Sequence, residues 1–433
     1  MFWNKEIETL ESGKMKEIQL ERLMNIVHRA YEKVPFYNRK FTAAGIKPED
    51  INSLEDIKKI PFTTKDDLRE NYPYDLFAKS MDDIVRIHAS SGTTGKPVVV
   101  GYTEEDLTNW TNCVTRLIAA AGGRKSDVAQ VAFGYGMFTG GFGLHYGLEN
   151  MGMTVIPASS GNSEKQIMMM KDFGTTVLIG TPSYALYLSE VAEDMGVDPV
   201  DLNLRLGLFG GEGHTEEMRN EIEKRWGMKV TENYGLSEIV GPGVSGECTE
   251  QQGLHINEDH FYPEIVDPET GENKKPGEKG ELVLTTLTKQ GIPMLRYRTG
   301  DITFLNPEPC SCGRTTTRMN KILGRTDDML IVKGVNVFPS QIESVLVGMD
   351  NIGPHYQIVL RKDGYMDDIQ VRVEMASSDV LDNYSALEKI EQEIKKKLRS
   401  VLNIEVKVKL VEPRTLARTT GKAKRVVDLR DQD

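Results

Sequence analysis

Residues 90–97 gather small and hydroxyl-bearing side chains directly before an apolar run. They read SSGTTGKP, and VVVGY follows at residues 98–102. Glycines expose backbone N–H groups, hydroxyls add donors that rotate to fit, and Lys96 adds positive charge, which together suit a polyphosphate. The segment is not the P-loop of kinases and GTPases, because Ser90 replaces its first glycine and Pro97 replaces the residue that would hold magnesium. A flexible Ser/Gly linker is the alternative, and the lysine and proline make it the weaker one.

Three cysteines and one histidine have the composition of a metal site. Cys248 and His255 lie in ECTEQQGLH, and Cys310 and Cys312 form a CSC segment further along the chain. Three thiolates and an imidazole make a full tetrahedral zinc set, and a closed set of four ligands is structural. Three small buried residues beside an unrelated histidine are the alternative. We expect a structural Zn²⁺ that clips the surrounding strands, whereas Cys113 lies in a helical segment and is expected in the core.

The elements that must position these residues follow a regular alternation. Strand-like segments lie at residues 128–135, 154–159, 175–182, 205–212 and 229–235, and helical segments lie at 164–173, 184–196 and 215–227. This rhythm predicts a mostly parallel sheet covered by helices. Such sheets bind ligands at the carboxyl ends of their strands, so the loops that follow strands are the candidate site.

Two changes of pattern indicate further organisation. Helical periodicity disappears over residues 253–305, where Gly- and Pro-rich turns join strand-like segments. After GRTDD at residues 324–328 the chain reads as a self-contained α+β unit. We therefore predict an α/β fold with a large N-terminal domain, residues 1–326, that contains the mostly parallel sheet and a β-rich subdomain. A small, mobile α+β C-terminal domain follows at residues 327–433.

Composition excludes several kinds of partner. The 433 residues have a net charge of −12, so no overall basic field favours nucleic acid. No run approaches the roughly 18 apolar residues that a membrane span requires. Four cysteines are too few for a disulfide scaffold in a chain of this length. We expect a cytoplasmic protein that acts on small molecules without a membrane partner, and a homodimer is left open.

Several motifs stand in a characteristic order along the chain. They are SSGTTGKP (90–97), YGLSE (234–238), YRTGD (297–301), GRTDDMLIVKGVNVFP (324–339) and RTTGKAKR (418–425). Together they resemble those of the adenylate-forming acyl-CoA synthetases. The short chain, the cysteine pattern, PFTTKDDLR (61–69) and FGYGMFTGGFGLHYG (133–147) look like the phenylacetate-CoA ligase branch of that family. The resemblance implies ATP-dependent ligation of an aryl acid, foremost phenylacetate, to coenzyme A through an acyl-adenylate, with release of AMP and pyrophosphate.

The same resemblance implies roles for residues of the ATP site. The phosphates would be held by Ser90, Ser91, Gly92, Thr93, Thr94 and Lys96. Glu238 would ligate Mg²⁺, with Ser237 where a threonine is more usual. Tyr234 would stack on adenine, with a packed core aromatic as the alternative. The nucleotide would be bordered by Gly211, Glu212, Asn233 and Gly235. Asp301 would accept both ribose hydroxyls, which suits a carboxylate with two acceptor oxygens, and Arg325 would be a second ribose contact.

The resemblance also singles out the C-terminal region. Lys422, which alone would be taken for a solvated surface lysine, would bridge the substrate carboxylate and the α-phosphate during adenylation. Asp327 matches the hinge about which the C-terminal domain turns between the half-reactions. That turn would remove Lys422 and bring residues 332–338 toward the thiol of coenzyme A.

Three residues are weaker candidates. Lys65 is either a phosphate contact or a surface lysine, and Tyr135 and Phe142 are candidate walls of the acyl pocket that core packing explains equally well. Two other functions stay open. An enzyme that passes the acyl group to a carrier protein would share every ATP motif. A non-catalytic nucleotide-binding regulator is disfavoured, because Lys422 and Glu238 are both present.

Overall fold

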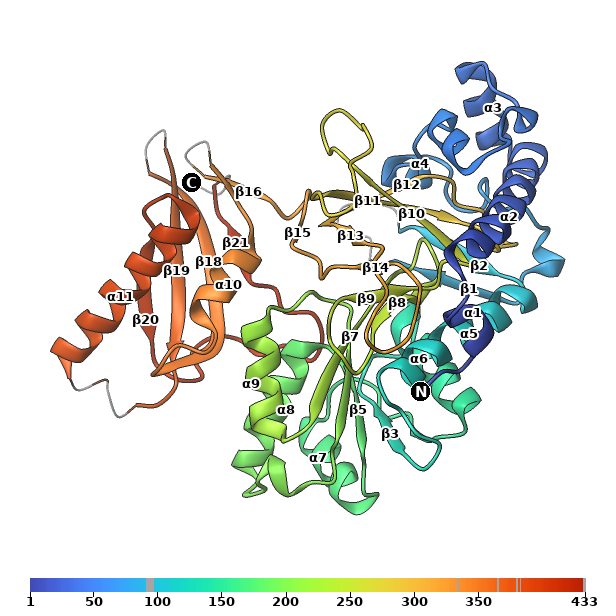
Figure 1. Cartoon of the computed structure of the whole chain (residues 1–433). Coiled ribbons are helices and arrows are strands. Elements are labelled where there is room, and N and C mark those ends of the chain that lie inside the picture. Colours follow the sequence, from blue (N-terminus) through green and yellow to red (C-terminus); the bar gives the residue numbers. More distant parts are fainter. Residues whose placement is uncertain (91–96, 333–334, 364–365, 379–380, 382, 431–433) are drawn as a thin grey trace.

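The computed structural model describes residues 1–433 except 91–96, 333–334, 364–365, 379–380, 382 and 431–433. Figure 1 shows a large N-terminal domain, coloured from blue to yellow, and a smaller C-terminal domain in orange and red. The α/β class and this division agree with the sequence prediction. Within the described part of the chain, no helix is long and apolar enough to cross a membrane.

A nine-stranded sheet lies at the centre of the N-terminal domain, in the order β13-β14-β9-β8-β7-β6-β5-β3-β4. Its parallel half consists of β3 (Val128–Val131), β4 (Thr154–Ile156), β5 (Val177–Gly180), β6 (Leu206–Phe209) and β7 (Lys229–Leu236). Its antiparallel half consists of β8 (Gly241–Glu247), β9 (Leu254–Ile256), β13 (Leu305–Asn306) and β14 (Arg318–Met319). The parallel strands are those that the alternation of the sequence predicts.

Helices cover this sheet. Its parallel strands are connected by α6 (Thr139–Met151), α7 (Ser163–Asp172), α8 (Pro182–Asp194) and α9 (Glu216–Trp226), and α5 (Glu104–Ala120), which precedes β3, packs against β8 and α6. The loops after β5 and β6 lead into helices that begin at capping threonines. Thr181 accepts a hydrogen bond from the backbone of Tyr184, and Thr215 accepts one from Met218. These caps fix where each loop at the carboxyl end of the sheet stops.

Two smaller sheets complete the N-terminal domain. One is antiparallel and contains β10 (Phe261–Val266), β11 (Gly280–Thr286), β12 (Tyr297–Thr303) and β15 (Gly324–Arg325). The other is a hairpin of β1 (Arg86–Ala89) and β2 (Val99–Tyr102). The N-terminal helices are α1 (Lys5–Glu8), α2 (Ser12–Lys33), α3 (Pro35–Ala44) and α4 (Lys65–Glu70). The largest buried hydrophobic cluster joins α2 and α5 to the strands of both larger sheets.

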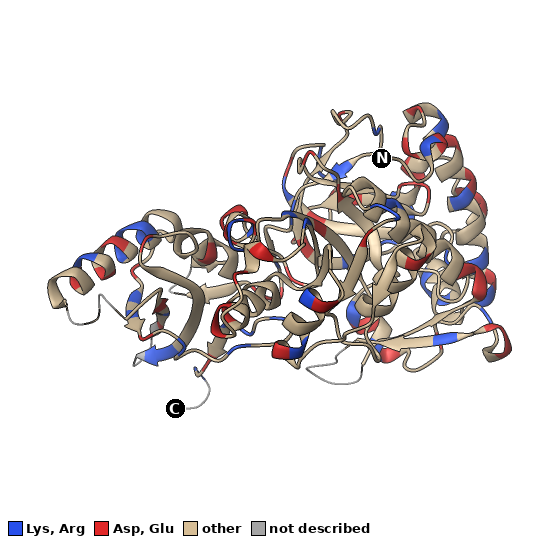
Figure 2. Cartoon of the chain, turned by 90° about the horizontal axis from the view of Figure 1, so that it is seen from below, with Lys and Arg blue, Asp and Glu red and all other residues tan. Residues whose placement is uncertain are grey.

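The C-terminal domain has its own sheet and core. Strands β18 (Ile352–Asp363), β19 (Met366–Met375), β20 (Lys407–Val411) and β21 (Val426–Asp428) form it in the order β20-β19-β18-β21. A hairpin of β16 (Leu330–Val332) and β17 (Val335–Val337) and the helices α10 (Pro339–Leu346) and α11 (Tyr384–Leu402) complete the domain. Helix α11 buries Ile394, Leu398 and Leu402. Figure 2 shows acidic and basic residues interspersed along the outer helices, in keeping with the absence of a basic field.

Candidate active site

A cavity of about 1690 Å³ brings together nine of the predicted site residues that the structure describes. Its lining includes Lys65, Gly211, Asn233, Gly235, Ser237, Glu238, Arg325, Asp327 and Lys422. These residues come from α4, from the ends of β6 and β7, from the β-rich sheet and from the C-terminal domain. Residues far apart in the sequence therefore face one space between the domains.

Asp301 is buried beside this cavity and is held by hydrogen bonds. It lies opposite Arg325 in the pairing of β12 with β15 and is only 3% exposed. Its Oδ2 accepts a hydrogen bond from the hydroxyl of Tyr234 at 2.6 Å, and its Oδ1 accepts one from the guanidinium of Arg325. Arg325 also donates from Nε to Oδ1 of Asp327 at 2.8 Å. Burial raises the pKa of Asp301, and the charge of Arg325 opposes that rise.

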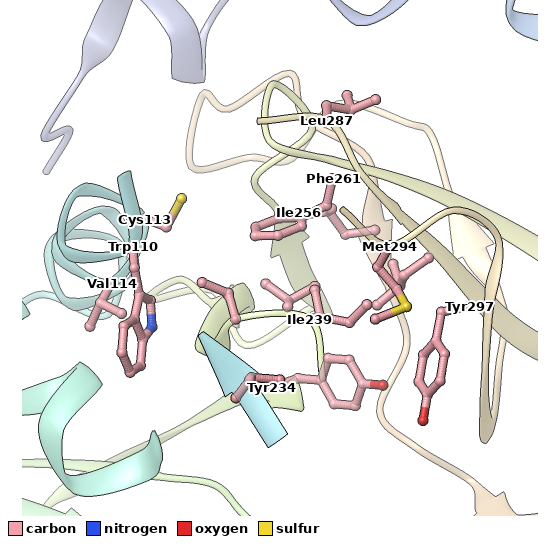
Figure 3. Close-up of a cluster of buried hydrophobic side chains, with 14 of the residues drawn as sticks. Trp110, Cys113, Val114, Tyr234, Ile239, Ile256, Phe261, Leu287, Met294 and Tyr297 are labelled. Carbon is pink, nitrogen blue, oxygen red and sulfur yellow. The ribbon is translucent and has the colours of Figure 1, made fainter. Parts of the chain in front are cut away.

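The ring of Tyr234 lies in the hydrophobic core. Figure 3 shows it among buried side chains that include Ile239, Met294 and Tyr297. Burial, together with the negative charge of Asp301, raises the pKa of Tyr234 well above its ordinary value, so the phenol stays protonated and can donate to the carboxylate. Stacking of Tyr234 on adenine stays a prediction, whereas its packing in the core is observed.

The turn that carries Glu238 is fixed from beneath by a buried lysine. Lys289 donates from Nζ to the carbonyl oxygen of Glu238 at 3.2 Å and to that of Ile239 at 2.6 Å. Burial lowers the pKa of Lys289 to about 8. Beside Glu238, the hydroxyl of Ser237 lies 3.1 Å from that of Thr139. Sequence reasoning missed Lys289, because its segment TTLTKQG has no motif and its burial depends on the tertiary fold.

Gly235 allows the strands β7 and β8 to come very close. Their register shifts between Tyr234 and Gly235. A Cβ atom at position 235 would lie 1.7 Å from the carbonyl oxygen of Gly241, a distance that no side chain tolerates. The close approach at the end of β7 therefore requires glycine there.

Glu212 joins the two domains next to Lys422. Its Oε2 accepts a hydrogen bond from the backbone N–H of Ala423 at 2.9 Å. The hydroxyl of Thr181 donates to the carbonyl oxygen of Gly421 at 3.2 Å. These two bonds hold the backbone on both sides of Lys422, a role for Glu212 that its predicted position beside the nucleotide did not include.

The predicted phosphate loop is closed at its base by Ser90. Its Oγ accepts a hydrogen bond from the backbone N–H of Val98 at 3.1 Å, and its N–H donates to the carbonyl oxygen of Val98 at 2.9 Å. Ser91, Gly92, Thr93, Thr94 and Lys96 lie outside the described residues. Their contact with phosphate stays a prediction.

Some aromatic residues of the segment 133–147 line the cavity and others pack away from it. Among the described residues, the cavity is lined by Phe133, Phe138, Gly141, Leu144 and Pro242, and neither Tyr135 nor Phe142 belongs to the lining. The rings of Tyr135 and Phe142 pack edge to face with centroids 5.3 Å apart. The hydroxyl of Tyr135 lies 3.0 Å from Nδ1 of His145. The predicted acyl-pocket role of Tyr135 and Phe142 stays untested. Phe133 and Phe138 belong to the same aromatic segment of the sequence, which suggested walls for the pocket, but they were not the two residues selected from it.

The predicted zinc ligands are brought together by the fold. One ligand atom from each of Cys248, His255, Cys310 and Cys312 lies within 4.8 Å of the others. The sulfurs of Cys248 and Cys310 are 3.8 Å apart, and Sγ of Cys312 is 3.5 Å from Nε2 of His255. The other ring nitrogen of His255 lies 3.1 Å from the hydroxyl of Thr316, which orients the imidazole toward the sulfurs.

Comparisons with known proteins agree with this geometry. The family model for AMP-binding enzymes matches residues 25–288, and that for the C-terminal domain of AMP-binding enzymes matches residues 334–430. A phenylacetate-coenzyme A ligase of Thermus thermophilus is 48% identical over 99% of this chain and 100% of its own length. A phenylacetate-coenzyme A ligase of Escherichia coli is 48% identical over 98% of this chain and 97% of its own.

Solved structures add the arrangement of the domains. A 2-hydroxyisobutyryl-CoA ligase in the postadenylation state matches with a TM-score of 0.94 and 30% identity, covering 100% of this chain and 93% of that one. The same enzyme with CoA in the thioesterification state matches with a TM-score of 0.74 and 31% identity, covering 99% and 93%. The domains of this chain are thus arranged more like those of the postadenylation structure.

Proposed function

The chain belongs to the AMP-binding enzyme family, in its phenylacetate-coenzyme A ligase branch, and from this premise we propose that it ligates phenylacetate to coenzyme A using ATP. The carboxylate attacks the α-phosphate of ATP, so that pyrophosphate leaves and phenylacetyl-AMP forms. The thiol of coenzyme A then attacks the acyl carbon, and AMP leaves. One observation carries the proposal: Lys422, Glu238 and Arg325 line one cavity in a chain 46% to 48% identical to four such ligases.

Both nucleophiles belong to the substrates, so the protein must position them and stabilise the charge that develops. Lys422 supplies an ammonium group to the oxygens of the carboxylate and the α-phosphate as the new bond forms. Asp301 already accepts bonds from Tyr234 and Arg325, and each carboxylate oxygen keeps a further lone pair for a ribose hydroxyl.

Glu238 fits the role of a Mg²⁺ ligand. Glu238 and Ser237 both line the cavity, and oxygen ligands are those that Mg²⁺ prefers. The bonds from Lys289 fix the backbone of the turn that carries Glu238 before any ligand arrives. When bound, Mg²⁺ would neutralise charge on the phosphates.

The second half-reaction requires a different arrangement of the same parts. We place the domain boundary between residues 326 and 327, with Asp327 as the hinge residue. Rotation there would withdraw Lys422 and bring residues 332–338 to the thiol, where small side chains leave room for pantetheine. The ion pair between Arg325 and Asp327 spans this boundary and would have to adjust during the turn.

A split between the half-reactions tests the role of Lys422. Lys422→Ala should lower phenylacetate-dependent exchange of pyrophosphate into ATP by roughly a hundredfold, the usual effect of losing one charge-stabilising donor. Thioester formation from supplied phenylacetyl-AMP and coenzyme A should change little. Lys424→Ala is the matched control, since Lys424 lies two residues away and is also exposed. Equal loss of both steps in Lys422→Ala would refute the assignment.

The cluster of cysteines and histidine supports a structural Zn²⁺ site. The ligand set is complete without water, so the metal would stabilise the fold of the surrounding strands. Protein prepared without a His-tag should contain close to one zinc per chain on this four-ligand expectation. Cys310→Ser should lose that zinc, and Cys113→Ser, a change in the hydrophobic core, should retain it. Less than about 0.2 zinc per chain in the unaltered protein would contradict the structural Zn²⁺ site.

Three further expectations stay predictions. The prediction that Tyr135 and Phe142 form walls of the acyl pocket can be tested by comparing which carboxylic acids the Tyr135→Ala and Phe142→Ala variants and the unaltered protein adenylate. A cytoplasmic location and a homodimer can be tested by cell fractionation and by light scattering.

A further inference from the structure

The segment that carries Lys422 runs along helix α8 of the N-terminal domain. Gly421 contacts Thr181 at the first end of the helix, and Arg418 contacts Glu190 further along. Arg414 contacts Asp194 at the last turn. The segment therefore runs antiparallel to α8, and the two remain in contact along a helix about 20 Å long. These contacts mark the path of the segment from the start of α8 to its last turn.

The middle contact is the most elaborate of the three. The guanidinium of Arg418 donates from Nε to Oε2 of Glu190 at 2.9 Å and from a terminal nitrogen to Oε1 at 3.2 Å. Nε2 of His355 lies 2.9 Å from the same Oε1. Burial opposes ionisation of Glu190, but its hydrogen bonds with His355 and Arg418 and their charges lower its pKa to about 2. Glu190 is thus the point on which two side chains of the C-terminal domain converge.

The side chain of Arg418, which contacts Glu190, is also held by a residue of its own domain. Two of its nitrogens donate to the two carboxylate oxygens of Glu374, each at 2.9 Å. Arg418 and Glu374 belong to the same domain, so a rotation of that domain leaves their pair intact. Glu190 belongs to the other domain, so the same rotation separates it from Arg418 and His355. The contact with Glu190 is therefore specific to the arrangement in which Lys422 faces the cavity.

We propose that Glu190 is a positioning residue of the adenylation half-reaction, acting through Arg418 and His355 to hold Lys422 over the cavity. The proposal rests on the ligase function proposed above. The side chains of Arg418 and Glu190 are only 14% and 16% exposed, so solvent screens their bidentate pair weakly. By contrast, the Arg414 and Asp194 side chains are 62% and 49% exposed, and such pairs contribute little. Loss of Glu190 should shift the population of domain arrangements away from the adenylating one.

Half-reaction kinetics separate this role from a general structural one. Glu190→Gln keeps the shape of the side chain and removes its charge. It should lower phenylacetate-dependent exchange of pyrophosphate into ATP by roughly thirtyfold or more, as expected when a desolvated charge pair between two surfaces loses one partner. Thioester formation from supplied phenylacetyl-AMP should be unchanged or faster. Asp194→Asn, which removes an exposed carboxylate from the same helix, should keep both rates within about twofold.

Equal loss of both half-reactions in Glu190→Gln, or full exchange activity, would overturn the proposal. Small-angle X-ray scattering in the presence of ATP supplies a readout that needs no acid substrate. Unaltered protein should match the profile calculated from the present domain arrangement, and Glu190→Gln should deviate from it. If unaltered protein catalyses no exchange while Glu190→Gln still changes the scattering, the positioning role stands and the ligase function is what fails. If the unaltered protein catalyses normal exchange and Glu190→Gln leaves the scattering profile unchanged, the positioning role of Glu190 is wrong.

Discussion

At the scale of single residues, Asp301, the proposed ribose contact, accepts hydrogen bonds from both Tyr234 and Arg325. Asp301→Asn keeps the size of the side chain but replaces one acceptor oxygen with an amide that donates toward Tyr234 or Arg325, which are themselves donors. A bond to a charged group contributes about 1.5 to 3 kcal/mol. We expect kcat/KM for ATP to fall at least tenfold, measured by the release of AMP.

Tyr234→Phe is the matched control for that substitution. It removes the hydroxyl that donates to Asp301 and keeps the ring in the hydrophobic core. A smaller loss than in Asp301→Asn is expected, because Arg325 still orients the carboxylate. An equal or larger loss in Tyr234→Phe would mean that the hydroxyl of Tyr234, and not the carboxylate of Asp301, dominates binding of the nucleotide.

The motifs allowed nine of the residues that line the cavity to be predicted from the sequence. They could not indicate Lys289 or Glu190, because neither lies in a motif and each acts through a partner far away in the chain. Lys289 binds the backbone at Glu238, and Glu190 binds Arg418. Glu212 shows the same limit, since its bond to Ala423 arises only when the domains meet.

At the scale of elements, the end of β7 depends on one glycine. Gly235→Ala would place its methyl group against the carbonyl oxygen of Gly241, so β8 would have to move. Overpacking of this kind costs about 1–3 kcal/mol, and because Ser237 and Glu238 follow directly, adenylation should fall as well. Urea unfolding and pyrophosphate exchange measure the two effects.

Gly13→Ala is the control for that substitution. An added Cβ at position 13, in helix α2, has nothing within 4 Å, and alanine favours a helix over glycine. It should leave activity unchanged and stability equal or slightly higher. Unaltered stability and exchange in Gly235→Ala would show that β7 and β8 can separate without cost.

The parallel strands were predictable because each alternates with a helix of a different hydrophobic period. The antiparallel half of the sheet was not. Strand β8 has the sequence GPGVSGE and is buried at every position. It therefore shows neither the alternation of apolar and polar residues nor the run of β-branched residues by which a strand is recognised in a sequence. Strands β13 and β14 contain two residues each, which is too short for any periodicity. Their place in the central sheet is decided by packing against neighbouring strands.

At the scale of the whole molecule, the proposed function assigns a different arrangement of the domains to each half-reaction. The TM-score is 0.94 with a postadenylation structure and 0.74 with a thioesterification structure, although the two comparisons differ little in sequence identity. Glu190 and Glu212 both contact the C-terminal domain in its present position. The sequence predicted two domains and a hinge, but the contacts between them require both folded surfaces.

The release of AMP is the measurement that tests the account most directly. Protein, ATP and Mg²⁺ would be supplied with a panel of aryl and alkyl carboxylic acids, each with and without coenzyme A. Turnover should depend on coenzyme A, be fastest with phenylacetate, and yield one phenylacetyl-CoA for each AMP. If no acid released AMP while ATP still bound, or if phenylacetate were adenylated but never transferred to coenzyme A, the ligase function would be contradicted.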